Sequence, residues 1–289
     1  MRTDTIALCY PNRIELASLS SPTAFAAELP ITNLQDPVFN HWARRVGVDP
    51  LQINGTFSKQ YFLGCLAIAA HNLSGAATWR ARLYSTTADV GSNTNVVYDS
   101  SIQRVWPSLY TFGQIPWGFD NWWSGGARDE DRGNFTPLSV AVTDSVLARG
   151  FTIDIEDADN PDGYLQVGRV MVSDLWQPTY NYSFGSEQGY DFRADSESAL
   201  DDTEYIERIS SRRLLNFTLE GMAQADAQGR SFDVMRMLGT DGELLVLPNQ
   251  DSGIYQSQQT FIGRLQQINP LKTVNYDWHE HAYSIKEKT

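Results

Sequence analysis

The hydrophobic and polar residues of this chain alternate mostly with the two-residue period of β-strands. In the segment 151–156 every second residue is apolar, which is typical of a strand with one buried face. Residues 160–163 include the Pro and Gly of a chain reversal, and apolar residues of 165–172 then resume a strand pattern. We therefore predict that residues 149–178 form a long β-hairpin whose apolar face packs on a second sheet.

Strand patterns cover most of the chain. Residues 61–70 are nearly all apolar, as expected of a central strand covered on both faces, and residues 71–74 have the composition of a turn. A separate strand, 52–57, is expected to pair with this central strand. The remaining expected strands are 5–10, 77–84, 138–142, 212–219, 243–247, 259–265 and 283–287.

The order of these elements predicts a mainly β fold in two domains. Residues 1–190 are expected to form a jelly-roll-like antiparallel β-sandwich, and the polar, acidic segment 191–204 suits a linker or an exposed arm. Residues 205–289 are expected to form a smaller α+β domain for ring formation or assembly. Its one helix is expected over 223–238, with Gly239 as its C-terminal cap and with Ala227, Phe232, Met235 and Leu238 facing inward.

Charge excludes one class of partner. The 289 residues carry a formal net charge of −13, whereas a nucleic-acid-binding surface needs a basic stripe. The arginine pairs 44–45 and 212–213 are interpreted as isolated surface charges. No apolar run approaches the roughly 20 residues that span a bilayer, so no membrane insertion is expected.

The cysteines and the N-terminus indicate a reducing compartment. Two cysteines do not make a disulfide framework, and Cys65, inside the apolar run 61–70, is expected to be a buried free thiol. Residues 1–13 lack a sustained apolar stretch and do not resemble a signal peptide. We expect synthesis in the cytoplasm.

No pattern in the sequence predicts catalysis, a metal site or a cofactor. The sequence has no G-x-S-x-G, P-loop or H-E-x-x-H motif, so no catalytic residues are assigned. The acidic group within 154–162 surrounds the predicted turn, but its spacing is not that of a calcium loop, and a solvated turn is favoured. His279 and His281 supply two ligands where a zinc site needs three or four.

Four tryptophans lie in an irregular segment, 100–135, that fits no helix or strand period. Aromatic side chains in such a loop have three interpretations: a hydrophobic plug of the core, a subunit interface or a platform for sugar rings. We expect a protein–protein contact or ligand surface here, and folding of the rings onto the sandwich as a cap stays open. The residues concerned are Trp106, Trp117, Trp122 and Trp123.

Three segments, 33–44, 67–82 and 157–169, together resemble structural tail proteins of long-tailed bacteriophages. Their most specific pieces are His71-Asn72-Leu73-Ser74 and the D-x-D-N-P-D-G-Y run 157–164. That family carries a jelly-roll sandwich similar to discoidin-type carbohydrate-binding modules. The C-terminal segments 261–265 and 281–287 are similar to tail-tip ring subunits.

The resemblance implies a structural protein of the virion, assembled in the host cytoplasm. It would be a distal tail or baseplate ring subunit that joins the tail tube to the hub or fibres. Its partners would be copies of itself, in a homo-oligomeric ring with six copies as one option, and the tube, hub and fibre proteins. The alternative is a receptor-binding module that contacts a glycan of the host surface.

Overall fold

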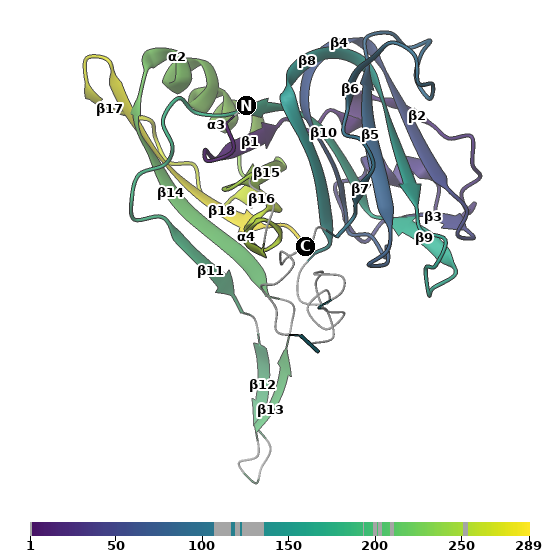
Figure 1. Cartoon of the computed structure of the whole chain (residues 1–289). Helices are drawn as coiled ribbons and strands as arrows, with labels where there is room; N and C mark the ends of the chain where they lie inside the picture. Colours follow the sequence, from purple (N-terminus) through teal and green to yellow (C-terminus); the bar gives the residue numbers. More distant parts are fainter. Residues whose placement is uncertain are drawn as a thin grey trace.

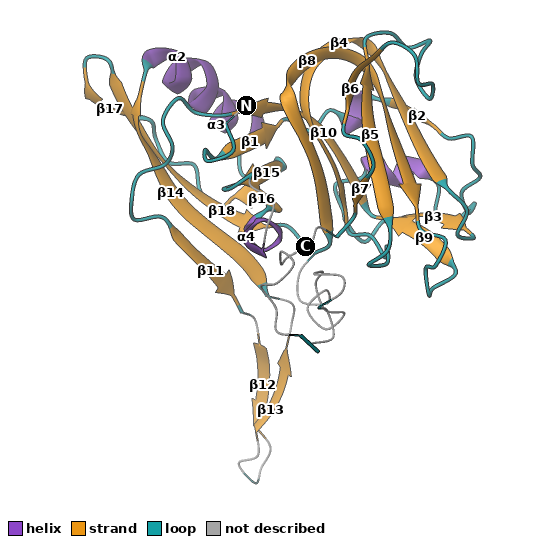
Figure 2. Ribbon diagram, in the orientation of Figure 1, coloured by secondary structure: helices purple, strands orange, loops and turns teal. Residues whose placement is uncertain are grey.

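The computed structural model describes residues 2–106, 117–118, 122, 136–192, 194–198, 201, 204–208, 211–250 and 254–289. Strands dominate these residues, and the named strand pairs are all antiparallel (Figure 2). They form a β-sandwich and a smaller α+β unit beside it (Figure 1). The expected fold class, a jelly-roll-like sandwich followed by an α+β unit, is therefore confirmed.

Two long strands build both sheets of the sandwich. β4 (Leu51–Ala69) and β8 (Leu138–Glu156) pair along their length. Their register shifts between Thr56 and Tyr61, where the exposed residues 58–60 interrupt an otherwise buried pattern. Both strands thus bend from one sheet to the other, and the bend lies at the top of the sandwich in Figure 1.

Shorter strands complete the two sheets. β5 (Thr78–Tyr84) pairs with the C-terminal half of β8, and β10 (Arg169–Trp176) pairs with the C-terminal half of β4. The apolar residues that alternate along these halves meet in the core between the sheets, including the fully buried Leu66, Phe151 and Ile153. The other strands of this unit are β2 (Ser18–Ser20), β6 (Val96–Asp99), β7 (Gln103–Arg104) and the separate pair β3 (Ala43–Val46) and β9 (Tyr164–Val167); the short helices η1 (Ile14–Leu16) and η2 (Ile31–Gln35) lie between its first strands in sequence.

The N-terminal strand joins the two units into one sheet. β1 (Ala7–Tyr10) lies between β10 of the sandwich and β15 (Leu244–Leu247) of the α+β unit. All four of its residues are buried, because Leu8 and Tyr10 face the α+β core while Ala7 and Cys9 face a third apolar cluster on the other side. The continuous order is β11-β14-β18-β16-β15-β1-β10-β4-β8-β5-β6.

The α+β unit consists of the rest of this sheet and a helical segment. The helical segment runs through α2 (Gln224–Asp226), η3 (Ala227–Ser231) and α3 (Phe232–Leu238), and α4 (Ile254–Gln259) precedes β16. No helix among the described residues is long and apolar enough to cross a membrane. The remaining strands are β11 (Glu187–Asp191), β14 (Arg212–Met222), β16 (Phe261–Leu265), β17 (Lys272–Asn275) and β18 (Trp278–Glu287).

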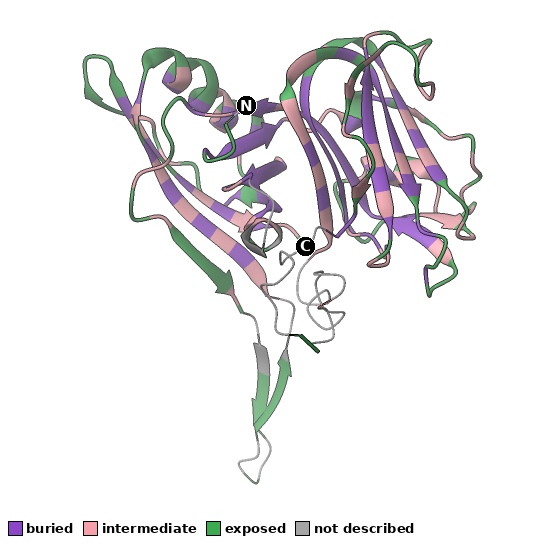
Figure 3. Cartoon of the chain, viewed as in Figure 1, coloured by how far each residue is buried: buried purple, intermediate pink, exposed green. Residues whose placement is uncertain are grey.

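A two-stranded ribbon projects from this unit. β12 (Ala194–Ser198) and β13 (Glu204–Arg208) pair only with each other and point away from both units (Figure 1). We call residues 187–208, which include β11 at the base, the arm. The segment 191–204, expected as a linker or arm, supplies β12 and the first residue of β13. The described side chains of the ribbon are exposed (Figure 3).

The hairpin expected over 149–178 is wrong. β8 and β10 do not pair with each other, because β4 lies between them, and β9 pairs with β3. The pairing expected between 52–57 and the following strand is also wrong, since both segments belong to β4. Alternation shows that a strand has one buried face, but it does not identify the neighbouring strand.

The inward face of the helix differs from the expected one. Ala227 and Leu238 are buried as expected, and Met235 is half-buried. Phe232, however, is 47% exposed, and the inward positions are Ser231 and Val234. The inward face could not be identified from apolar residues alone, because the polar Ser231 lies on it. The Ser231 hydroxyl contacts Tyr283 Oη at 2.8 Å. Gly239 caps the helix with a φ of 56° and a hydrogen bond to the Met235 carbonyl.

Candidate functional site

The candidate tryptophans differ in their surroundings. Trp106 is buried, its Nε1 donates to the Leu73 carbonyl oxygen at 2.9 Å, and its ring lies edge-on to His71 at 5.6 Å. Trp117 is 80% exposed, and its ring centroid lies 6.2 Å from that of the half-buried Trp122. Trp106 therefore caps the end of the sandwich core. Trp123 lies outside the described residues, and the contact expected of the other two stays a prediction.

The two most specific motifs of the sequence lie against each other. The buried carboxylate of Asp157 accepts hydrogen bonds from the Ser74 amide at 2.8 Å, from Ser74 Oγ at 2.5 Å and from Asn160 Nδ2 at 2.8 Å. Three donors satisfy this carboxylate without a cation. The interaction fixes the turn at 71–74 to the loop after β8.

Asn72 completes this connection. Its Nδ2 donates to Asp162 Oδ2 at 2.8 Å and to the Tyr164 carbonyl at 3.0 Å, and its Oδ1 accepts the Gln166 amide at 2.9 Å. Gly163 takes a φ of 73° in the same loop, a conformation that favours glycine. The cluster positions the end of the sandwich.

His71 stays neutral at this end of the sandwich. Burial lowers the pKa of its imidazole to about 3, since a charged ring would lose its hydration. The described part of the chain offers no hydrogen-bond partner to its Nδ1. The ring therefore packs against Trp106 and carries no charge at neutral pH.

The exposed side of this end presents a cation and an aromatic ring together. The Arg44 guanidinium lies 4.0 Å from the centroid of the Tyr164 ring. Its Nε and Nη2 both donate to Gln166 Oε1, at 3.1 and 2.8 Å. Both Arg44 and Tyr164 are half-buried. This pair and the neighbouring Asp162 form a polar surface with one aromatic face.

The arginine pair 212–213 is only partly a surface feature. Arg213 is buried and forms an ion pair with Glu287 at 2.5 Å, so its interpretation as an isolated surface charge is wrong. The ion pair could not be predicted from the sequence, because Glu287 is 74 positions away from Arg213.

A second buried ion pair connects the two units. Arg169 of β10 is fully buried, and its Nε and Nη2 donate to Glu243 Oε2 at 3.0 and 2.6 Å. Lys288 donates to the other oxygen of Glu243 at 2.8 Å. Burial raises the pKa of the Glu243 carboxyl, but the two cations outweigh burial, and the pKa lies below its usual value.

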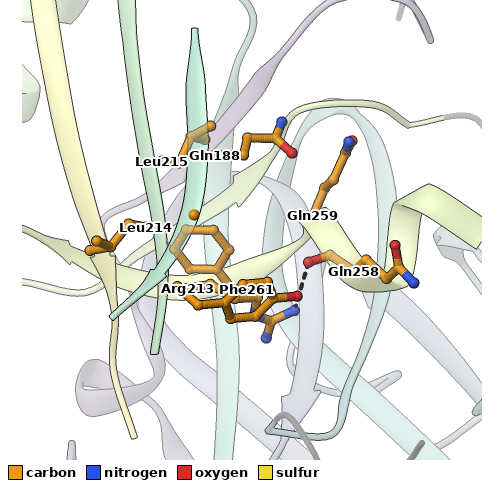
Figure 4. A pocket seen from close by; sticks show the side chains of 9 residues that line it. Gln188, Arg213, Leu214, Leu215, Gln258, Gln259 and Phe261 are labelled. Carbon is orange, nitrogen blue, oxygen red and sulfur yellow. Dashed lines mark hydrogen bonds between the residues drawn. The ribbon is translucent and has the colours of Figure 1, made fainter. Parts of the chain in front are cut away.

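A small open pocket of about 210 Å³ lies at the base of the arm (Figure 4). Gln188 of β11 and Gln259 of α4 lie on its rim, and Phe261 and the aliphatic side chains of β14 line it (Figure 4). The pocket has the size of one large side chain. In the part of the chain that the structure describes, no group of three potential metal ligands occurs there or elsewhere.

His279 and His281 face the same way, as the alternation of β18 requires, and both are buried. Burial lowers the pKa of His281, whose Nε2 donates to the Asn269 carbonyl at 3.0 Å. Its Nδ1 then accepts the Ser231 hydroxyl at 2.7 Å. Both nitrogens of His281 are therefore engaged in structural hydrogen bonds.

No protein-family model and no curated protein matches the chain. Solved structures match part of the chain. The lectin domain of lectinolysin, complexed with Lewis B antigen, shares 10% identity over 57% of this chain and 96% of that chain, with a TM-score of 0.36. A fucose binding module of Streptococcus pneumoniae, SpX-3, shares 11% identity over 60% of this chain and 100% of that chain, with a TM-score of 0.35.

A third similar structure is chitosan-binding module 1 of a chitosanase/glucanase from Paenibacillus sp. IK-5. It shares 11% identity over 56% of this chain and 98% of that chain, with a TM-score of 0.36. None of these three is a phage tail protein.

Proposed function

We propose that the chain is a non-catalytic structural subunit of a multi-copy particle, of the kind found at the tail tip of a long-tailed phage. In this proposal the α+β unit and its arm make the contacts between subunits. The sandwich is held beside them as a rigid attachment. The resemblance of the segments 33–44, 67–82 and 157–169 to tail proteins supports the phage assignment.

The observation that carries the proposal is the exposed arm. Tyr190, Phe192, Tyr205 and Ile206 have exposed fractions from 51% to 66%. The rings of Tyr190 and Phe192 lie 5.8 Å apart at the base of the ribbon. A monomeric protein rarely exposes a gathered set of large apolar side chains, and a free two-stranded ribbon is marginally stable in water. A partner that covers the arm would bury these apolar side chains and stabilise the ribbon.

The junction of the two units supports the second part of the proposal. β1 hydrogen-bonds to β10 on one side and to β15 on the other. The buried Arg169–Glu243 pair adds a charged connection near this junction. A sandwich joined in this way keeps a fixed orientation on the particle.

The native mass of the purified protein tests the proposal. We expect a defined multiple of the 32.5 kDa chain, and we expect the protein in purified particles of the phage that encodes it. No cleavage of bacterial surface polysaccharides is expected. A protein that stays monomeric at all concentrations, or that is absent from the particles, contradicts the proposal.

Glycan binding by the sandwich is the second candidate function. The observation in its favour is the Arg44–Tyr164 pair beside Asp162, because aromatic faces next to a few directed polar groups are typical of small-molecule sites. Calorimetry with fucosylated, chitosan-type and uronate oligosaccharides tests this function. We expect binding that Tyr164→Ala abolishes and that the distant change Val97→Ala leaves intact. Absence of binding to every sugar contradicts it.

A further inference from the structure

Three cationic side chains gather where β4 and β8 bend. The Arg13 guanidinium lies 5.0 Å from the centroid of the Tyr61 ring, and Lys59 Nζ lies 5.3 Å from the same centroid. Arg149 donates to the carbonyl oxygens of Phe57 and Ser58, at 3.3 and 2.9 Å. Backbone and ring contacts thus hold the cations at one place on the surface.

None of these three cations forms an ion pair within the described residues. The chain as a whole has a net charge of −13, and this part of its surface contains three cations without an ion-pair partner among the described residues. Charges of one sign that converge on a surface attract a partner of the other sign.

Two large apolar side chains are exposed on the same stretch of β4 and β8. Phe62 of β4 and Leu147 of β8 face each other across the strand pair, and both are exposed. We call Arg13, Lys59, Tyr61, Phe62 and Arg149 the bend patch. A partner that fits it carries negative charge together with apolar or aromatic side chains.

The arm of this same chain has that composition. Residues 187–208 contain eight acidic residues and two arginines, so the arm has a formal charge of −6. Glu204 and Glu207 are exposed on β13, on either side of the exposed Tyr205 and Ile206. Acidic and apolar side chains are therefore exposed together on β13, as a partner of the bend patch requires.

We propose that the bend patch of one copy binds the arm of a second copy. This inference rests on the multi-copy assembly proposed above and names its contact surfaces. The bend lies at the top of the sandwich and the arm points away from the bottom of the molecule (Figure 1), so a chain does not reach its own patch. The contact is head to tail, and repetition of such a contact closes a ring or extends a filament.

Charge exchange between the two surfaces tests the inference. One variant carries Lys59→Glu and Arg149→Glu, and the other carries Glu204→Lys and Glu207→Lys. Each variant alone should weaken self-association by about tenfold or more, because rim charges of like sign face each other. An equimolar mixture of the two variants forms mixed contacts of restored complementarity and should associate more tightly than either variant alone.

Lys272→Glu is the matched control, since Lys272 is an exposed cation on the distant β17. It should leave association unchanged, and melting temperatures check that every variant is folded. Sedimentation equilibrium at low and high salt measures the association.

The outcomes separate the inference from the function on which it rests. Assembly that neither charge-exchange variant weakens overturns the inference and leaves the proposed function standing. A monomeric wild-type protein overturns both. Binding of the patch to an acidic polysaccharide such as alginate, lost in the Lys59→Glu and Arg149→Glu variant while assembly persists, assigns the patch to a glycan and overturns the inference.

Discussion

The core of the sandwich and the arm of the α+β unit differ in how far their side chains are buried and in whether the chain itself supplies their partners. In the sandwich, Ile153 is fully buried, and the buried carboxylate of Asp157 has three hydrogen-bond donors of its own chain. In the arm, Tyr205 and Ile206 face solvent beside Glu204 and Glu207. The difference indicates that the sandwich is complete by itself, whereas the arm is built for a partner.

Replacement of an isoleucine by aspartate should change the free energy of unfolding very differently in the two regions. Ile153→Asp buries an unpaired carboxylate between the sheets and should lower the free energy of unfolding by about 4 kcal/mol or more. Ile206→Asp, the matched change in the arm, should change it by less than about 0.5 kcal/mol. Urea denaturation measures both. Equal losses of unfolding free energy at the two positions would contradict the difference between a buried sandwich core and an exposed arm.

Removal of the charge on Glu243 tests the junction between the regions. Glu243→Gln keeps the shape of the side chain but leaves the buried Arg169 with the exposed Glu15, 3.0 Å away, as its one remaining acidic partner among the described residues. The loss of the buried counter-charge should cost about 3 kcal/mol. Because the folded-state pKa of Glu243 is lowered, its contribution is present above the pKa of the unfolded chain and is lost as pH falls through the folded value. The difference between wild type and variant should therefore shrink in acid.

Denaturation at neutral pH and near pH 3 measures this change. Glu220→Gln, at an exposed carboxylate of β14, is the control and should have little effect at either pH. A Glu243→Gln variant as stable as wild type at neutral pH would show that the ion pair does not stabilise the junction.

His71 should make the sandwich sensitive to mild acid. Its pKa is about 3 in the folded protein, so below the ordinary histidine pKa of the unfolded chain, near 6.5, the unfolded state binds more protons. Stability is lost as pH falls, by about 2 kcal/mol between pH 7 and pH 5 from this residue. His71→Phe keeps a ring against Trp106 and should remove that part of the pH dependence. An unchanged pH dependence in the variant would place the titrating group elsewhere.

Two tryptophans give the smallest stability effects. Trp106→Phe removes the hydrogen bond to the Leu73 carbonyl and should cost about 1 to 2 kcal/mol, whereas the exposed Trp117→Phe should cost less than about 0.5 kcal/mol. Thermal melting compares the two variants. A larger loss for Trp117→Phe would show that Trp117, and not Trp106, is the cap.

The sequence predicted local strands better than their pairing. Alternation around Ile153 and Trp79 identified the faces of β8 and β5 that join the core, but Thr152 and Arg82 on the opposite faces are buried as well. It did not show that β4 separates β8 from β10, because each strand carries the same two-residue signal whichever neighbour it has. The bend in β4 was missed for a related reason: three exposed residues, 58–60, have the composition of a turn between two strands.

The surfaces were predictable only in part. The acidic composition of 191–204 indicated an exposed segment, but the pairing of β12 with β13 depends on alignment that charge does not specify. The motifs at Asn72 and Asp157 were recognised separately, and their contact is not visible in a sequence because 83 positions separate Ser74 from Asp157. Arg169 and Glu243, 74 positions apart, were missed for the same reason.

The native mass of an arm variant tests the central claim most directly. Tyr205→Ser together with Ile206→Ser removes the two large apolar side chains of the ribbon, and Val97→Ser together with Ile102→Ser is a control at exposed residues of the sandwich. The arm variant should keep the melting temperature of the folded chain and sediment at 32.5 kDa, while wild type and control sediment as a defined multiple of that mass. An arm variant that assembles like wild type would contradict the account.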